Sequence, residues 1–130
     1  MATLTPTLTL VSTDAFAHQP ISVSVTDSLS IVAPYTDLSR IAAATSAGTE
    51  LIAASQAVVT YVYLKHTGTL AADGNATTNL VTVENAASGE GIATLEAGEF
   101  MFFPLKASEG LQLISATAPV FVEYIYFSKA

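Results

Sequence analysis

The side chains best suited to metal chemistry in this sequence are its two histidines. His18 and His66 stand far apart along the chain, and neither belongs to a pair of the form HxH or HxxxH. A zinc site takes three or four ligands, and the cysteines that often supply them are absent. The spacing therefore predicts no metal ligand at either histidine.

A serine hydrolase is the other chemistry that His66 could serve, because a Ser-His-Asp triad is assembled in space and not in sequence. The GxSxG turn that presents such a serine is absent. We therefore expect His66 to be structural. The sequence predicts no catalytic residue, and the chain is not expected to be an enzyme.

Two pairs of side chains with carboxylate or amide oxygens could hold a proton or a cation. Glu96 and Glu99 flank Gly98, and paired carboxylates are what glycosidases use, but this spacing indicates a turn between two strands. Asp73 and Asn75 offer oxygen ligands, whereas Ca²⁺ takes six or more. We expect both pairs to be loop residues, with no cofactor and no bound metal.

The amino-acid composition limits the classes of partner that the chain can bind. Four Lys/Arg against eleven Asp/Glu give a net charge of -7, the wrong sign for holding phosphate backbones, so direct nucleic-acid binding is not expected. Only 12% of residues are charged, against about 25% in an average globular protein. No run of about eighteen apolar residues occurs, so no membrane span is predicted. A charge-poor surface rich in Thr and Ser is suited to being covered by other proteins.

Short alternating segments separated by turn residues predict an all-β fold, a single antiparallel β-sandwich of jelly-roll type. One short helix at most is expected, near residues 37–45, with Asp37 as its N-cap. Asp27 and Ser28 are predicted to form a tight turn, and a polar loop is predicted to begin at His66. The predicted strands are residues 3–10, 21–25, 29–33, 50–54, 57–65, 80–84, 92–95, 99–105, 111–116 and 120–127.

The first of these strands has a distinctive pattern. Residues 3–10 alternate polar and apolar side chains, which places Leu4, Leu8 and Leu10 on one face of an extended chain. Pro6 cannot donate a hydrogen bond to a neighbouring strand, so this segment should lie at a sheet edge or form an arm on another surface.

We therefore predict an N-terminal strand or arm at residues 1–12 and a β-sandwich domain at residues 13–130. The candidate residues for contact with a partner are Leu4, Pro6, Leu8 and Leu10.

The last predicted strand, residues 120–127, is apolar on both faces except at Glu123. One face should pack on the opposite sheet, and the other should be covered by residues 35–49 or by another subunit. The aromatic side chains lie inside strands, which favours packing in the core. A carbohydrate-binding module, in which aromatics stack on sugars, remains an alternative.

Three segments of the C-terminal half carry a family resemblance: YVYLKHTG at residues 61–68, LEAGEFMFFPL at 95–105 and VEYIY at 122–126. They resemble small β-sandwich structural proteins of tailed bacteriophages. The resemblance implies a protein of the virion, assembled in the host cytoplasm and located on the head surface.

Such a protein is expected to act as a capsid decoration or cement protein. Its implied partners are other virion proteins, in particular the major capsid protein, whose shell it would stabilise. A homo-oligomer such as a trimer is expected, because closed rings match the local symmetry of shells. A fibre, collar or tail-associated location is the alternative.

Overall fold

The structure, a computed structural model, describes residues 1–130. It contains twelve β-strands and no helix, and hence no helix able to cross a membrane. The chain forms two compact units: Met1–Val32 together with Lys129–Ala130, and Ala33–Ser128. We call the first the ribbon unit and the second the sandwich.

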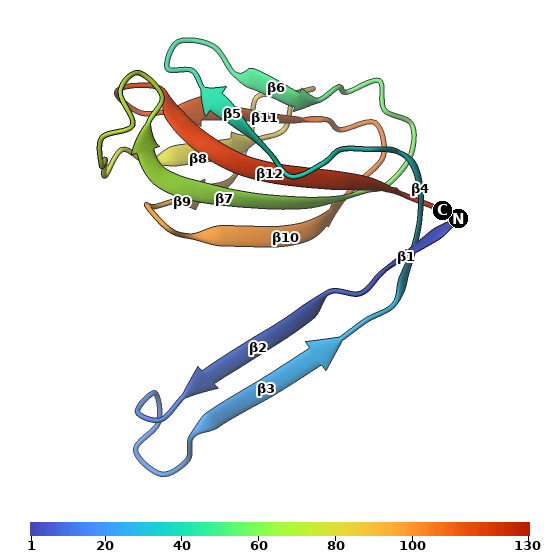
Figure 1. Ribbon diagram of the computed structural model, residues 1–130, viewed down its shortest axis with the longest axis vertical. Coiled ribbons are helices and arrows are strands. Elements are labelled where there is room, and N and C mark those ends of the chain that lie inside the picture. Colours follow the sequence, from blue (N-terminus) through green and yellow to red (C-terminus); the bar gives the residue numbers. More distant parts are fainter. The chain divides into compact units, whose positions relative to one another are not determined.

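The sandwich consists of two antiparallel sheets (Figure 1). The first is six-stranded, with the order β1-β4-β12-β7-β10 and with β5 also paired to β12; β1 is Ala2–Leu4 and β4 is Leu29–Tyr35. Its other strands are β5 (Ser39–Ala43), β7 (Thr60–Leu70), β10 (Phe100–Leu105) and β12 (Val120–Lys129). The second has the order β6-β11-β8-β9. Its strands are β6 (Thr49–Ile52), β8 (Val81–Glu84), β9 (Gly91–Leu95) and β11 (Leu111–Ser115).

The eight strands from β5 to β12 pair in sequence order, from the two ends of the chain segment toward its middle: β5 with β12, β6 with β11, β7 with β10 and β8 with β9. Lateral pairs β12 with β7 and β11 with β8 complete the two sheets. A long antiparallel hairpin rolled up in this way is a jelly roll. The predicted antiparallel jelly-roll sandwich is therefore confirmed.

The core lies between the two sheets and follows from the period of two along each strand. Every second residue of β7, β8, β11 and β12 points inward, and the inward apolar side chains at their centres have no exposed area. They are Val62, Leu64, Val81, Val83, Leu111, Leu113, Val120 and Val122.

The ribbon unit is a two-stranded antiparallel ladder. Strand β1 (Ala2–Leu4) pairs with the start of β4, and β2 (Thr7–Ser12) pairs with β3 (Ile21–Thr26). The register is the same in both ladders, and the Asp27 amide donates to the Pro6 carbonyl at 3.1 Å between them. One ladder thus continues past Pro6, which lies opposite Asp27 and accepts its amide hydrogen bond but has no N–H to donate in return.

This ladder corrects the predicted domain boundary after residue 12. The two units divide after Val32, and residues 21–25, predicted to belong to the sandwich, form the second strand of the ribbon. Asp27 and Ser28 form no tight turn, because the backbone hydrogen bond to Pro6 keeps the chain extended there. The alternation of residues 3–10 identified one strand correctly but not its partner.

The predicted helix near residues 37–45 is absent, and the segment forms β5 instead. Its alanines favour a helix, but pairing decides: Arg40 lies opposite Glu123 and Ala43 opposite Val120 on β12. Asp37 therefore has no helix to cap, and its backbone carbonyl accepts a hydrogen bond from the Ser39 hydroxyl. Long-range pairing with β12 overrides the local helical signal.

The polar loop predicted from His66 begins later, since β7 continues to Leu70. His66 lies opposite Val122 and Leu70 opposite Val120, and the Thr67 hydroxyl donates to the Phe121 carbonyl at 2.7 Å. The other predicted strands of the sandwich match observed strands, with ends that differ by a few residues.

Candidate functional site

The His66 ring is fully buried in the sandwich, and both of its nitrogens are satisfied by the backbone. Nε2 lies 2.7 Å from the Asn79 carbonyl, and Nδ1 accepts a hydrogen bond from the Gly68 amide at 2.9 Å. Both contacts are made only when the proton is on Nε2, which then donates to Asn79. The ring joins β7 to the segment before β8 and is aimed at no serine hydroxyl.

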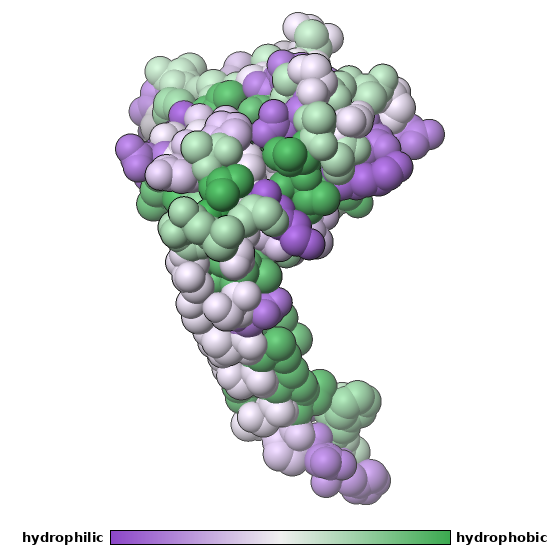
Figure 2. All heavy atoms as spheres, turned by 90° about the vertical axis from the view of Figure 1, so that its right-hand side faces the viewer, coloured by the Kyte–Doolittle hydropathy of each residue, from purple (hydrophilic) through white to green (hydrophobic).

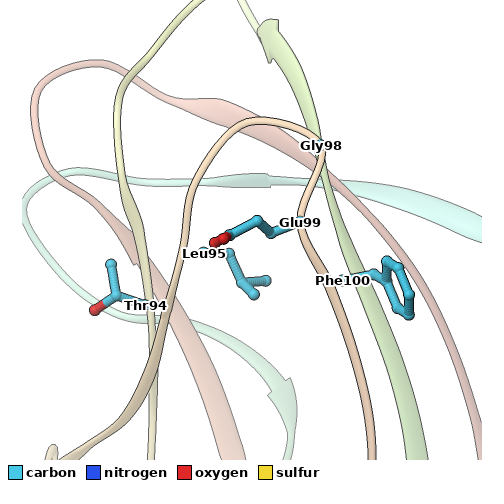
Figure 3. Close-up of a pocket in the computed structure, with 5 residues that line it drawn as sticks. All are labelled: Thr94, Leu95, Gly98, Glu99 and Phe100. Atoms are coloured by element: carbon cyan, nitrogen blue, oxygen red, sulfur yellow. The ribbon is translucent and has the colours of Figure 1, made fainter. Parts of the chain in front are cut away.

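The acidic candidates lie in turns. The Glu99 carboxylate accepts a hydrogen bond from the Glu96 amide at 2.8 Å, and the Glu99 amide donates to the Glu96 carbonyl at 3.0 Å, which closes the turn around Gly98. Figure 3 shows a shallow hollow beside this turn, where the Glu99 carboxylate points toward Leu95 and the Phe100 ring points to the opposite side. Glu99 therefore shapes a turn.

Asp73 acts in the same way. Both of its carboxylate oxygens accept hydrogen bonds from Asn75, one from the amide at 3.0 Å and one from the side chain at 2.8 Å. His18 is exposed in the loop at the end of the ribbon. No group of three or more His, Cys, Asp or Glu side chains is placed to hold a metal ion.

Two surfaces of the protein present rows of exposed apolar side chains. The first of these surfaces lies on the ribbon. Because β2 and β3 pair in a fixed register, Leu8 lies opposite Val25 and Leu10 opposite Val23. These four side chains share one face, and each keeps between 42% and 57% of its area exposed. We call them the ribbon stripe. Figure 2 shows hydrophobic side chains gathered along one side of the ribbon.

The opposite face of the ribbon is neutral and polar. Nearly every residue on it is Thr or Ser, and the hydroxyls of Thr7 and Thr26 lie 3.0 Å apart across the strands. Val11 is the apolar exception. The face comprises Thr3, Thr5, Thr7, Thr9, Val11, Ser22, Ser24, Thr26, Ser28 and Ser30. The two faces thus differ in polarity along the whole ladder.

Of the predicted contact residues, Leu8 and Leu10 lie in the ribbon stripe. Leu4 and Pro6 follow the same alternation closer to the start of the chain, and both are only partly exposed. The residues that sequence reasoning missed are Val23 and Val25. Their alternation with Ser22 and Ser24 was visible, but nothing local indicates that they pair with β2.

The second apolar surface is the face of the β5-β12-β7-β10 sheet that points away from the core, which we call the outer sheet face. Phe100 and Phe102 on β10 are 63% and 41% exposed there, so core packing is the wrong prediction for these two rings. Phe102 stacks on Tyr61, with ring centroids 6.4 Å apart. The face comprises Arg40, Tyr61, Tyr63, Lys65, Phe100, Phe102, Pro104, Phe121, Glu123, Ile125 and Phe127.

Residues 35–49 do not cover this face, since β5 lies beside β12 in the same sheet. Phe121, Ile125 and Phe127 on β12 are accordingly left half-buried. The second face of residues 120–127 is expected to be covered either by residues 35–49 or by another subunit. Since residues 35–49 do not cover it, another subunit is the remaining alternative.

Charged groups form one row across the outer sheet face. Glu123 lies opposite Arg40 on one side and opposite Lys65 on the other. Neither cation forms an ion pair, and the Glu123 carboxylate accepts a hydrogen bond from the Tyr63 hydroxyl at 3.2 Å. Partial burial of Tyr63 and this contact raise the pKa of its hydroxyl. Two cations of this row are therefore unpaired, and most of the side chains around the row are apolar.

No family model matches the chain, and no curated protein matches it. Among solved structures it is similar to a chain described in the words "Bacillus endospore appendages form a novel family of disulfide-linked pili". The identity is 17% and the TM-score 0.46, over 78% of this chain and 91% of that chain. At these values the likeness carries no argument about function. This chain has no cysteine from which a disulfide link could be made.

Proposed function

We propose that this chain is a structural protein of a phage particle that decorates the head and cements it. The observation that carries the proposal is the ribbon stripe, a row of apolar side chains with no cover within its own ladder. Because a two-stranded ladder is only marginally stable in water by itself, an apolar row along it favours burial against another protein. The resemblance of the C-terminal half to small virion proteins is the reason for placing that contact in a phage particle.

The mechanism is contact. A protein that binds the assembled shell of the major capsid protein, and not its free subunits, stabilises that shell by linkage. The Thr/Ser face of the ribbon is neutral, so it can face water or a neighbouring subunit at little desolvation cost. The two unlike faces orient the ribbon when its stripe is buried.

Co-sedimentation with shells of the major capsid protein tests this function. Leu10→Asp places a charge in the stripe, and we expect it to weaken binding at least about tenfold, since a buried unpaired charge costs more than 1.4 kcal/mol. Thr9→Asp, the neighbouring exposed residue on the Thr/Ser face, is the matched control and should bind as the wild type does. Equal loss in both variants would contradict the role of the stripe.

Wild-type protein that stays in the supernatant would overturn the location on the head. Immunogold microscopy of intact particles then separates the fibre, collar and tail locations from one another. Antibody label at the tail with none on the head would identify the tail-associated alternative.

Carbohydrate binding is the second candidate, and the observation in its favour is the exposure of Phe100 and Phe102 on one flat face. Sugar recognition also needs free polar groups beside the rings: the Tyr63 hydroxyl is engaged with Glu123, whereas Lys65, opposite Phe100, forms no ion pair. A glycan array decides this: binding that is lost in Phe100→Ala and kept in Leu10→Asp would support a lectin-like function.

A further inference from the structure

Two uncovered apolar surfaces occur in the same chain, the ribbon stripe and the outer sheet face. We propose that the stripe of one copy lies on the outer sheet face of a second copy of this chain. The inference rests on the proposed function in that it takes the ribbon stripe as the surface that holds each copy on the particle, and it names a neighbouring copy on the shell as the surface on which the stripe lies.

The small size of the stripe excludes a pair of ribbons as the whole contact. A fully buried Leu or Val side chain removes roughly 60–120 Å² of apolar area from water, so four half-exposed side chains contribute roughly 120–240 Å². A stable interface buries about 800 Å² on each partner. Two ribbons lying stripe to stripe fall far short, so the ribbon needs a wider surface that also covers its flanks.

The outer sheet face has the required width and chemistry. Four strands side by side span roughly 14 Å between the outer two, against about 5 Å for the two strands of the ribbon. Phe100 and Phe102 lie exposed on this face, and Ile125 and Phe127 lie half-buried beside them. An apolar stripe laid on these side chains covers both surfaces at once.

The charges of the two surfaces are complementary. Residues 1–32 contain Asp14 and Asp27 and no Lys or Arg, and the register of the ladder places Asp27 on the same face as the stripe. The outer sheet face holds Arg40 and Lys65, two of the four cations of the chain. Neither cation has an ion-pair partner in its own chain. Arg40 and Lys65 outnumber Glu123 on the outer sheet face, so Asp27 on the stripe side of the ribbon can give one of these cations a partner.

This contact joins different surfaces of the two copies, so each copy has one ribbon to offer and one face to fill. A heterologous contact of this kind closes into a ring or continues as an open chain. A trimer is one closed form. On a shell, copies linked in this way would hold neighbouring positions together, which is what a cement protein must do.

A complementation experiment in solution, without shells, tests the proposal. The ribbon variant Leu8→Asp/Leu10→Asp keeps its sheet face, and the face variant Phe100→Asp/Phe102→Ser keeps its ribbon. Measured by analytical ultracentrifugation, the wild type should self-associate and each variant alone should be monomeric. An equimolar mixture of the two variants should form a heterodimer that grows no further, because only one functional stripe and one functional face remain.

A mixture that stays monomeric while the wild type associates would overturn the proposed pairing of stripe and face. Wild-type protein that is monomeric at about 100 µM would overturn the self-contact altogether. If such a monomeric protein still binds shells through its stripe, the proposed function stands and this inference fails.

Circular dichroism would show whether the face variant misfolds. In that case an exchange of charges between the ribbon and the outer sheet face tests the proposal instead. Asp27→Lys and Lys65→Glu each change one exposed or half-exposed side chain. Each alone should weaken self-association about three- to tenfold, and a mixture of the two single variants should recover it. Absence of recovery in that mixture, with both variants folded, would contradict a contact between Asp27 and Lys65 surfaces.

Discussion

The ribbon and the sandwich are made of the same kind of strand and end in opposite states. In the sandwich, Leu64 and Leu113 alternate with outward residues and have no exposed area. In the ribbon, Leu8 and Leu10 alternate with threonines and keep about half of their area exposed. The difference lies in the second layer: each sheet of the sandwich has a facing sheet, whereas the two-stranded sheet of β2 and β3 has none within the ribbon.

This contrast shows that alternation specifies a strand and its two faces, but not what covers them. A two-stranded ribbon has no stable core of its own in water. The constant difference between the two faces of the ladder, apolar on one and Thr/Ser on the other, therefore points to a function outside the fold of the single chain.

The largest expected effect comes from making the same substitution in both regions. Leu64→Ala should lower the free energy of unfolding by about 3–4 kcal/mol, because it leaves a cavity between the sheets. Leu10→Ala should lower it by less than about 1 kcal/mol, because that side chain is half in water. Denaturant melts measure both. Equal losses would show that the stripe is buried within the single chain.

The outer sheet face lies between these extremes, and Tyr63 reports on it. Its raised pKa means that the folded protein holds the hydroxyl proton to higher pH than the unfolded chain does, whose tyrosines titrate near pH 10. Stability from this group is therefore complete below about pH 10 and falls as pH rises through the raised pKa. Melts of Tyr63→Phe between pH 9 and pH 11 should fall less steeply than those of the wild type.

Tyr61→Phe is the control for that experiment, since it alters a neighbouring tyrosine of the same strand and face. An unchanged pH profile in Tyr63→Phe would mean that the contact with Glu123 does not persist in solution.

The smallest effect is expected in the loops of the sandwich. The Asn85 side chain, followed by Lys106, holds the pKa of the partly exposed Glu109 carboxyl below its usual range. Stability from this group is present above about pH 4.3 and is lost as pH falls through the lowered pKa. Glu109→Gln should flatten that slight acid dependence, measured by thermal melts. A steeper acid loss in the variant would contradict the assignment.

The sequence by itself determined that the chain is all-β, where most sandwich strands lie, and that Leu8 and Leu10 share one face. These are consequences of the period of two and of turn residues, which act over a few positions. It also indicated that His66 and the Glu96–Glu99 pair are structural, and their hydrogen bonds account for both placements.

Only the tertiary structure decided the rest. The segment at residues 37–45 became a strand because β12 offers it a free edge, and Val23 joined Leu10 because two distant strands pair in one register. The exposure of Phe100 and Phe102 depends on which side of β7 the second sheet covers. Each of these outcomes is set by contacts between residues far apart in sequence, which no local pattern encodes.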